Sequence, residues 1–371
     1  MNHRCIVIGA GIIGSALAAR LAEAGAQVTI IEALSPGGGT SKYSLAWINS
    51  NGKPPRRYHD LNVAGIHAWR QLATRLGNDW LKSGGSLHWR TAQDADQLIE
   101  HVKELRAWEY PAQILSPSQA LGLEPSLTLP SDVGEIAYFP EEAYLLTTPA
   151  ITTLLQYAKS RGATLISNDP VAELLMTSNR LYGVKLVSGI RIEADTVALC
   201  TGWRTPTLAA QIDIDVPLTP VDLPGSTAPC LIAYTTPVRD GLTRLICGPG
   251  FSARPDENGR VFLEIDDLDE PINLTPDADQ LAAYARILFQ RARTILPSLA
   301  EATIAEHRLC ILPLPSDGYP IIGRPPAIEG CYVIVTHSGV TLAAHLATLA
   351  ATEILTQIDH PTLAPYRLQR F

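Results

Sequence analysis

The chain has little of what marks secreted, metal-binding or nucleic-acid-binding proteins. Its six cysteines form no Cys-x-x-Cys pair, which argues against a disulfide framework and against a zinc site. Its 29 basic residues are outnumbered by 37 acidic ones, and the net charge of −8 argues against a nucleic-acid partner. No apolar run reaches membrane-spanning length, and a strand pattern begins within the first residues, so we expect no membrane span and no signal peptide. These features predict a cytoplasmic protein without a bound metal.

The chain does have enough apolar material for more than one domain. Hydrophobic residues make up 46% of its 371 residues, so a sizeable core is available. This length exceeds that of one small domain, and two domains are the natural expectation.

The N-terminal segment follows the order strand, glycine-rich turn, helix, strand. Residues 4–8 form a short apolar run rich in β-branched side chains, and residues 27–31 form a second one. Between them, small and apolar residues recur at helical spacing up to Gly25, a good helix stop. The segment therefore predicts a βαβ unit.

The turn of this unit contains Gly9, Gly11 and Gly14 in the pattern Gly-x-Gly-x-x-Gly. The first glycine permits the tight turn, and the third allows the helix to pack closely on the strand. The second lets the backbone at Ile12 and Ile13, the positive helix N-terminus, approach a pyrophosphate. The pattern predicts a dinucleotide site.

An acidic residue completes this fingerprint. Glu32 follows the second strand, where it can accept hydrogen bonds from a ribose hydroxyl. The fingerprint alone leaves both FAD and NAD open.

Two later segments repeat the pattern of a buried strand that ends in a turn. Residues 196–199 form an apolar strand that runs into Cys200-Thr201-Gly202-Trp203. Residues 331–335 form a last strand, and a long helix begins near Gly339, which places another positive helix N-terminus beside a strand end.

With these residues the chain resembles the D-amino-acid oxidase superfamily, which includes glycine oxidase, sarcosine oxidase and bacterial amino-acid dehydrogenases. The resemblance covers nearly the whole length. It rests on the order and spacing of the N-terminal fingerprint and of "GGGTSKYSLAWINSNGKPPRRYHDLN", "GEIAYFPEEAYLLTTPAITTLL", "CTGW", "SDGYPIIGRPP" and "THSGVTLAA".

The resemblance implies FAD as the cofactor and two interleaved domains. One is an α/β FAD-binding domain, Rossmann-like and of the glutathione-reductase type, over residues 1–84, 147–219 and 306–371. The other is an α+β substrate domain with an antiparallel sheet, over residues 85–146 and 220–305.

Residue patterns in the second domain agree with this division. Asn258-Gly259 separates two strand-like runs, and Val261, Leu263 and Ile265 alternate with other residues, which predicts a hairpin. An amphipathic helix is predicted to follow, opened by Thr275-Pro276 and stopped by Pro297.

The resemblance also assigns residues to the cofactor. Thr40 and Ser41 match contacts to the pyrophosphate and ribose, although a glycine-rich loop with incidental hydroxyls would look similar. A second group matches the nucleotide-contacting turn and the helix start beside the flavin: Val171, Thr201, Gly202, Trp203, Gly339, Val340 and Thr341.

Polar residues expected along the flavin are the catalytic candidates. They are Asn49, Tyr58 and His59, with Lys53 as an ammonium that assists electron transfer to oxygen and His337 as a hydrogen-bonding partner of the substrate. The alternatives are a solvated loop, a surface lysine and a helix-start histidine that points to water.

One position departs from the family pattern. Many amino-acid-oxidising relatives place an Arg-Pro where this chain has Leu312-Pro313, and that arginine clamps the substrate carboxylate. Leucine cannot make this bidentate pair, so either another arginine replaces it or the substrate is not a simple amino acid. Arg254 and Arg308 are the possible replacements.

Cys310 precedes Asp317 with the spacing at which sarcosine-oxidase relatives tether the flavin covalently. Arg308, on the same side of the strand, could favour the thiolate. The competing interpretation is a buried thiol in an apolar strand.

These observations predict an FAD-dependent oxidoreductase that transfers hydride from the C–N carbon of a small amine or amino-acid-like substrate to flavin, leaving an imine. Reoxidation is expected by oxygen or another acceptor. The alternatives are a non-catalytic FAD-binding subunit of a multi-enzyme complex, and a hydroxy-acid oxidoreductase with His337 or His59 as base. An NAD-dependent dehydrogenase is disfavoured, because the matching segments are spread over the whole chain.

Overall fold

The computed structural model describes residues 3–223, 225–264 and 277–371. One half of the molecule is built on a six-stranded sheet in the order β19-β20-β13-β1-β2-β9. Its strands are β1 (Arg4–Ile8), β2 (Gln27–Glu32), β9 (Thr164–Ser167), β13 (Thr196–Leu199), β19 (Ile321–Gly323) and β20 (Cys331–Val335). β1 lies between β2 and β13 and is parallel to both. The strands predicted at residues 4–8, 27–31, 196–199 and 331–335 are therefore present, and they are neighbours.

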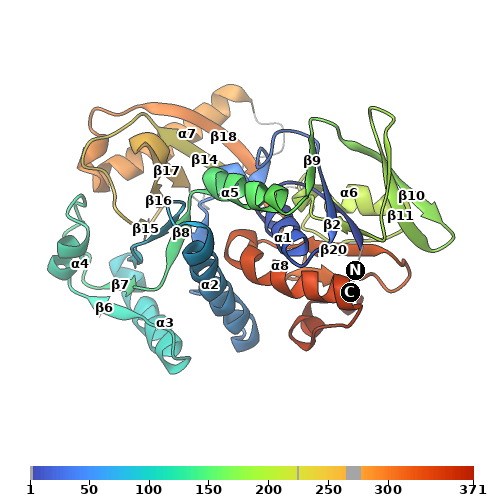
Figure 1. The fold of residues 1–371 in the computed structure, drawn as a ribbon. Helices are drawn as coiled ribbons and strands as arrows, with labels where there is room; N and C mark the ends of the chain where they lie inside the picture. Colours follow the sequence, from blue (N-terminus) through green and yellow to red (C-terminus); the bar gives the residue numbers. More distant parts are fainter. Residues whose placement is uncertain (1–2, 224, 265–276) are drawn as a thin grey trace.

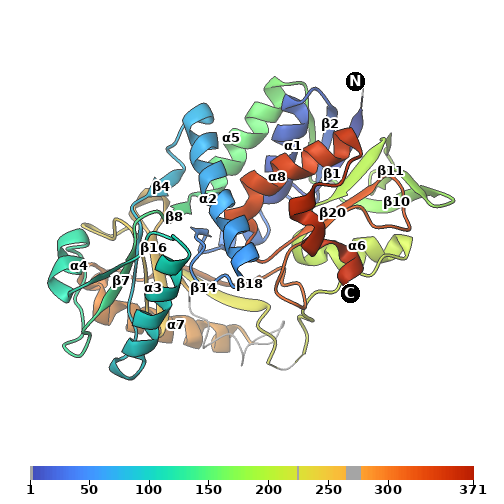
Figure 2. The ribbon, with the colours of Figure 1, turned by 90° about the horizontal axis from the view of Figure 1, so that it is seen from below.

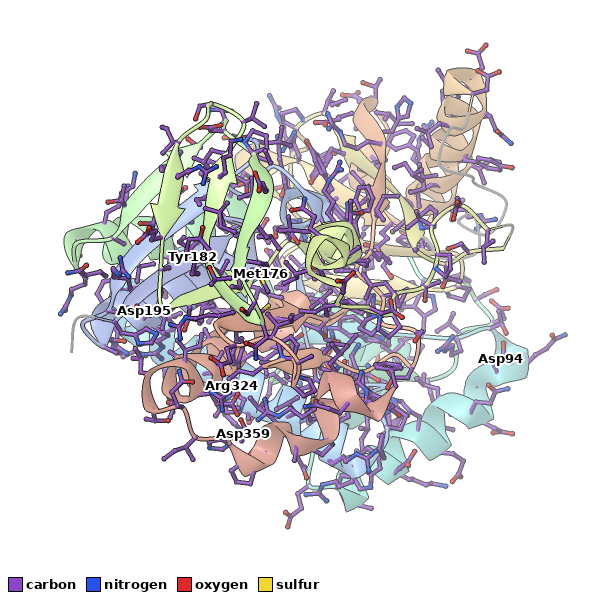
Figure 3. The ribbon with its side chains drawn as sticks, turned by 90° about the vertical axis from the view of Figure 1, so that its right-hand side faces the viewer. Asp94, Met176, Tyr182, Asp195, Arg324 and Asp359 are labelled. Atoms are coloured by element: carbon purple, nitrogen blue, oxygen red, sulfur yellow. The ribbon has the colours of Figure 1, made fainter. Side chains whose placement is uncertain are left out.

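Both faces of this sheet are covered, which explains the continuous apolar runs of its central strands. Helices pack on one face, with α1 against α5 and α8, and α8 against α2 (Figure 2). The helices are α1 (Ile12–Glu23), α2 (Arg56–Leu76), α5 (Thr147–Ser160) and α8 (Gly339–Thr356). The other face carries the three-stranded sheet β10 (Val171–Thr177), β11 (Arg180–Leu186) and β12 (Arg191–Glu193), on which Figure 3 labels Met176 and Tyr182.

The other half of the molecule is built on a mainly antiparallel eight-stranded sheet, in the order β18-β14-β17-β16-β15-β5-β7-β6 (Figure 1). Its strands are β5 (Ser86–His88), β6 (Gln113–Leu115), β7 (Ile136–Phe139), β14 (Pro229–Thr235), β15 (Leu245–Gly248), β16 (Phe251–Pro255), β17 (Val261–Glu264) and β18 (Ile304–Ile311). The remaining elements are β3 (Trp47–Ile48), β4 (Leu81–Ser83), β8 (Ala143–Leu145), α3 (Ala95–Ala107), α4 (Pro117–Leu123), α6 (Thr205–Ala209) and α7 (Ala278–Ile295).

The hairpin predicted around Asn258-Gly259 joins β16 to β17, and both turn residues have positive φ, as its tight turn requires. Helix α7 ends just before Pro297, as predicted. Ile265, Thr275 and Pro276 lie outside the described residues.

The domain boundary predicted at residue 306 falls inside a strand. β18 continues to Ile311, because its residues pair along their length with β14. The chain therefore remains part of the eight-stranded sheet beyond residue 306 and leaves it after Ile311. The other proposed boundaries fall between the strands of the two large sheets.

Helix α8 is a core helix that ends at the surface. Among the described residues it is the one helix long and apolar enough to cross a membrane, but 72% of it is buried inside the protein. Arg324 donates a hydrogen bond to the Glu353 carbonyl in its last turn and pairs with Asp359, and Figure 3 labels this ion pair. These guanidinium donors bind the carbonyl end of the helix, where positive charge is favourable.

The contact between α2 and α8 leaves no room for a side chain at Gly65. A Cβ atom there would lie 2.4 Å from the carbonyl oxygen of Thr341. We expect Gly65→Ala to destabilise the protein by about 1–3 kcal/mol, the usual cost of overpacking, and to lower the melting temperature. Gly122→Ala is the matched control, because a Cβ on that helical glycine meets nothing within 4 Å. Equal melting temperatures for the two variants would contradict this packing.

Candidate functional site

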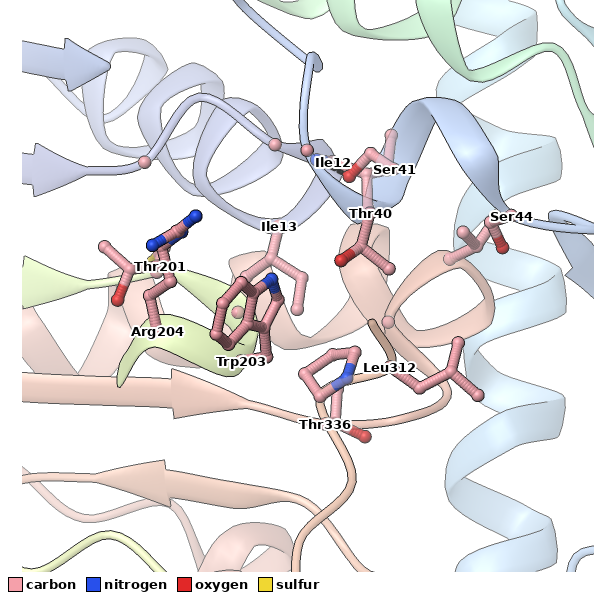
Figure 4. Close-up of a pocket in the computed structure, with 18 of the residues that line it drawn as sticks. Ile12, Ile13, Thr40, Ser41, Ser44, Thr201, Trp203, Arg204, Leu312 and Thr336 are labelled. Carbon is pink, nitrogen blue, oxygen red and sulfur yellow. Dashed lines mark hydrogen bonds between the residues drawn. The ribbon is translucent and has the colours of Figure 1, made fainter. Parts of the chain in front are cut away.

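A cavity of about 960 Å³ lies between the two large sheets, at the upper end of the range of small-molecule sites. Its lining comes from the carboxyl ends of β1, β2 and β13, from the first turn of α8, from β16 and β17, and from the segment after β18. Figure 4 shows Trp203 and Arg204 on one side of it, and Leu312 and Ser44 on the other. The carboxyl edge of a parallel sheet is where such folds bind ligands.

The glycine fingerprint forms one end of this cavity. Gly9 has φ +100°, and a Cβ there would lie 2.4 Å from the Cys200 carbonyl oxygen, so only glycine fits. Gly14 lies behind the wall, where a Cβ would lie 1.9 Å from the Gly9 carbonyl oxygen. Gly9 and Gly11 line the cavity with Ile12 and Ile13 at the start of α1. This is a bare backbone surface at a positive helix end, as an anionic pyrophosphate requires.

Glu32 also lines the cavity, and its carboxylate fixes the surrounding loops. It accepts hydrogen bonds from the backbone N–H of Ala10 at 2.7 Å and of Leu34 at 2.9 Å. A carboxylate has about four acceptor positions, so further ones remain for a ribose hydroxyl.

The hydroxyl residues predicted beside the nucleotide lie on the wall as well. Ser41 Oγ accepts a hydrogen bond from the Ile12 N–H at 3.0 Å, and Thr40 Oγ1 donates to the Ile311 carbonyl at 2.7 Å. The loop after β2 is thus attached both to α1 and to the end of β18. The other predicted cofactor residues on the wall are Val171, Thr201, Gly202, Trp203, Gly339, Val340 and Thr341.

Three of the predicted catalytic residues are among the lining residues. Asn49, Lys53 and His337 all border the cavity. Asn49 Oδ1 is buried on this wall and has no hydrogen-bond partner among the described residues. Buried polar atoms without partners are rare in proteins, and this one is available to a polar ligand in the cavity.

The charges of these residues depend on one another. The His337 side chain is exposed where it borders the cavity. Desolvation by the surrounding protein, together with the positive charge of Lys53, lowers its pKa to about 4. Burial lowers the pKa of Lys53 too, and the carboxylate of Glu142 opposes that change. The wall therefore offers an amine and an imidazole whose pKa values are both lowered.

Tyr58 and His59, predicted beside the flavin, do not border the cavity. Tyr58 is buried in α2, where its hydroxyl donates to Ser338 Oγ at 2.9 Å and so supports the start of α8. His59 is buried between Trp108 and Tyr110 and is hydrogen-bonded to Ser50. Both are placed to hold the wall rather than to contact a ligand.

Arg254 is likewise fully engaged within the protein. It is only 2% exposed, and its guanidinium donates to the carbonyl oxygens of Ser44 and Leu45 and pairs with Asp256 at 2.9 Å. Arg308 is exposed and lies over the Tyr43 ring at 4.3 Å. Leu312 does border the cavity. Neither arginine is thus placed to take over a carboxylate clamp at Leu312.

Cys310 lies behind the wall. It is 4% exposed, stands opposite Cys230 in the β14–β18 pairing, and packs in a small apolar cluster with Tyr43 and Phe262. Its Sγ lies 4.0 Å from the Thr40 carbonyl oxygen. The covalent tether remains a prediction that no contact of the thiol with the cavity supports.

Several lining residues were not among the sequence-based candidates. Arg204, which stacks on Trp203 at 4.3 Å, directly follows the predicted turn, so its position next to Trp203 was the signal that could have found it. Ser252 and Glu264 lie on strands of the other sheet, and only the three-dimensional fold brings them to the cavity.

Comparisons with known proteins agree with this site. A family model described as FAD dependent oxidoreductase (DAO) matches residues 4–353, so the chain belongs to this family. Glycine oxidase of Pseudomonas aeruginosa is 25% identical, over 95% of this chain and 94% of its own. The crystal structure of glycine oxidase from Geobacillus kaustophilus has a TM-score of 0.84 at 22% identity and covers both chains completely. L-proline dehydrogenase from P. horikoshii has a TM-score of 0.83 at 21% identity, over 100% of this chain and 98% of its own.

The chain is therefore an FAD-dependent oxidoreductase, and the predictions of fold class and cofactor are confirmed. The residues fit the cofactor: the glycine cradle and Glu32 suit its pyrophosphate and ribose, and the partnerless Asn49 oxygen suits a polar ring.

We expect Gly11→Val to abolish FAD binding, because the branched side chain occupies the space beside Ser41 Oγ that a Cβ already approaches to 3.1 Å. The ratio of flavin to protein absorbance in the purified variant measures this. Gly134→Val is the control, since a Cβ on that exposed glycine meets nothing within 4 Å. Full flavin occupancy in Gly11→Val would show that the pyrophosphate lies elsewhere.

Because the Cys310 thiol lies behind the wall, we expect FAD to be bound without a covalent bond. Acid precipitation should release yellow flavin into the supernatant, and the intact mass should be that of the polypeptide alone. Cys310→Ser should keep nearly full FAD occupancy. A coloured pellet, with a mass increase of one FAD that disappears in Cys310→Ser, would establish the tether instead.

Proposed function

We propose that the chain oxidises the C–N bond of an amine with more apolar bulk than a small amino acid, in particular a secondary or cyclic amine. The observation that carries this proposal is the composition of one part of the lining, made by Asn49, Lys53 and His337, which we call the flavin-side wall. These residues line the same cavity as Leu312. When bound, FAD supplies the acceptor for the hydride that leaves the carbon next to nitrogen. The product imine then hydrolyses or cyclises.

Lys53 is the group placed to bind an anionic part of the substrate. Lys53 and Arg204 are the two cationic side chains among the described lining residues, and Arg204 stacks on Trp203 beside the nucleotide turn. A single ammonium binds a carboxylate as a point charge, without the bidentate geometry of an arginine clamp. The substrate can therefore carry a carboxylate, but Lys53 orients it less firmly than an arginine would.

His337 is placed to act as a hydrogen-bonding group. Because its pKa is lowered to about 4, the neutral ring can accept a proton or hydrogen bond with one nitrogen and donate with the other. Beside an amine, the ring N–H donates to the nitrogen lone pair and so favours the unprotonated amine, which the loss of hydride from carbon requires. Desolvation by the enclosed walls strengthens these interactions.

The apolar part of the wall supports bulk on the substrate. Leu312, Tyr43, Leu45 and Trp47 border the cavity. An apolar substrate group packed there stabilises the complex by about 25 cal/mol per Å² of apolar surface removed from water. L-proline, in the name of one solved neighbour, is a cyclic secondary amine of this kind.

Reoxidation by oxygen and a cytoplasmic location complete the proposal. The Lys53 ammonium is suited to stabilise negative charge that develops on oxygen during electron transfer. A hydroxy-acid substrate is the second candidate, since the neutral His337 ring is able to act as the base that this reaction needs.

The test is anaerobic bleaching of the flavin absorbance by a panel of compounds: L-proline, N-benzylglycine, glycine, D-alanine and L-lactate. We expect the two secondary amines to bleach the flavin fastest. A clear preference for glycine or D-alanine would exclude the apolar-bulk proposal, and fastest bleaching by lactate would favour the hydroxy-acid reaction. A flavin that none of a wider set of amines and hydroxy acids bleaches would indicate a non-catalytic FAD-binding subunit.

A further inference from the structure

Trp47 is a half-buried aromatic residue on the cavity wall. It lies in the short strand β3 and borders the cavity together with Leu45 and Leu312. It was not among the sequence-based candidates, because the sequence does not show what a single tryptophan contacts. Large, rigid aromatic side chains contribute strongly to the binding of apolar ligand groups, so the orientation of this ring matters for the substrate.

The indole ring of Trp47 is fixed by contacts from several segments. Its Nε1–H donates a hydrogen bond to Glu142 Oε2 at 2.8 Å. Its ring packs against the His88 ring, with the two ring centroids 4.9 Å apart. Its backbone pairs with Tyr144 in β8, and its carbonyl oxygen accepts a hydrogen bond from the Thr341 hydroxyl at 3.0 Å. The hydrogen bond to Glu142 is the contact that holds the polar edge of the ring.

Glu142 is a buried carboxylate that directly precedes β8. It is 0% exposed, does not border the cavity, and was absent from the sequence-based candidates. Besides Trp47, the Tyr110 hydroxyl donates to this carboxylate at 2.8 Å and the Ser86 hydroxyl at 2.5 Å. A buried carboxylate needs such donors, because burial without partners is strongly destabilising. Of these three donors, only Trp47 borders the cavity.

The same carboxylate reaches a second point of the lining through Tyr110. The Tyr110 hydroxyl donates to Glu142 and accepts a hydrogen bond from the Ser50 N–H at 3.2 Å. Ser50 directly follows Asn49, which borders the cavity. Glu142 therefore fixes both ends of the short segment from Trp47 to Ser50, one directly and the other through a hydroxyl.

The hydrogen bond to Glu142 also decides what Trp47 presents to a ligand. An indole has a single polar group, the Nε1–H donor, and here the carboxylate already accepts from it. The apolar ring surface is what remains for a ligand. A polar substrate group packed against it would lose its hydrogen bonds to water without replacement, whereas an apolar group gains a favourable contact.

We propose that Trp47 is a specificity-determining residue whose ring contacts the apolar group of the substrate, and that Glu142 is the positioning residue that fixes this ring. The contact with the substrate rests on the proposed function, but the hydrogen bond between Glu142 and Trp47 does not. Because Glu142 does not border the cavity, its effect on substrate choice passes through Trp47.

The anchoring of the ring is measured on the FAD-loaded protein without substrate, as hydrogen exchange of the indole N–H groups in ¹⁵N-labelled protein. The signal of Trp47 is the one that Trp47→Phe lacks. Its exchange should be slow in the wild-type protein and about tenfold faster in Glu142→Leu, which removes the acceptor and keeps similar bulk. Glu142→Gln retains an acceptor oxygen and should retain slow exchange.

Glu141→Leu is the matched control for this measurement, because the Glu141 carboxylate pairs with Arg70 at 3.1 Å instead of with Trp47. It should leave the exchange rate unchanged. Fast exchange in the wild-type protein, or equal rates in the wild-type protein and Glu142→Leu, would overturn the anchoring.

Substrate choice is the second readout. N-benzylglycine and N-methylglycine differ only in the apolar group on nitrogen, and the wild-type protein should have the higher kcat/KM for N-benzylglycine. Trp47→Leu should lower the ratio of the two kcat/KM values about tenfold, mainly through the KM for N-benzylglycine. A merely structural defect would lower both values together and leave their ratio unchanged. A wild-type ratio in Trp47→Leu would overturn the role in specificity.

The positioning role is tested by the same ratio. Glu142→Leu should lower it severalfold, whereas Glu142→Gln and Glu141→Leu should keep the wild-type ratio. If Glu142→Leu does not fold, Trp47→Phe serves in its place, since it keeps an aromatic ring but lacks the anchoring N–H, and it should also lower the ratio severalfold. A wild-type ratio in Trp47→Phe would overturn the positioning role.

Two further outcomes separate this inference from the proposed function. Loss of FAD from Trp47→Leu would show that the ring contacts the cofactor, and would overturn the contact with the substrate. Flavin that no amine bleaches in the wild-type protein would refute the proposed function and the substrate contact with it, whereas slow exchange of the Trp47 indole would still establish its anchoring by Glu142.

Discussion

The hydroxyl of Thr341 joins two parts of the cavity wall, the segment around Asn49 and the first turn of α8. It donates a hydrogen bond to the Trp47 carbonyl at 3.0 Å and accepts one from the Asn49 N–H at 3.3 Å. Its own backbone is packed against Gly65 of α2. The segment that carries Asn49 and Lys53 is therefore fixed to the first turn of α8, the helix whose N-terminus borders the cavity. This attachment acts together with the pairing of β3 and β8, which also fixes the segment.

The ionisable groups around this wall depend on one another. Desolvation lowers the pKa of Lys53, the carboxylate of Glu142 opposes that change, and the charge of Lys53 adds to the lowering of the pKa of His337. Because these ionisable groups interact, their pKa values are coupled, and substitution of one of them changes the pKa values of the others.

Local patterns in the sequence were sufficient for the cofactor end and insufficient for the substrate end. The glycine turn, Glu32 and the start of α8 depend on neighbours in the chain, and the structure has them where they were predicted. The sequence around a polar residue of α2 such as His59 does not distinguish a side chain that contacts a ligand from one that is hydrogen-bonded to a buried part of the protein. Glu142 was missed because its donors come from three distant segments, those of Trp47, Ser86 and Tyr110. The boundary at residue 306 fell within β18, because strand length there is set by pairing with β14.

The central claim is that this cavity holds an amine whose C–H bond next to nitrogen is broken by hydride loss. The most direct test is the rate of anaerobic flavin bleaching, measured by stopped flow with the best amine of the panel and with the same amine deuterated on that carbon. The account predicts that deuterium on carbon slows bleaching severalfold, while exchange of the N–H protons in D₂O has a much smaller effect. Equal rates for the protiated and deuterated amines, with bleaching as the observed step, would contradict it.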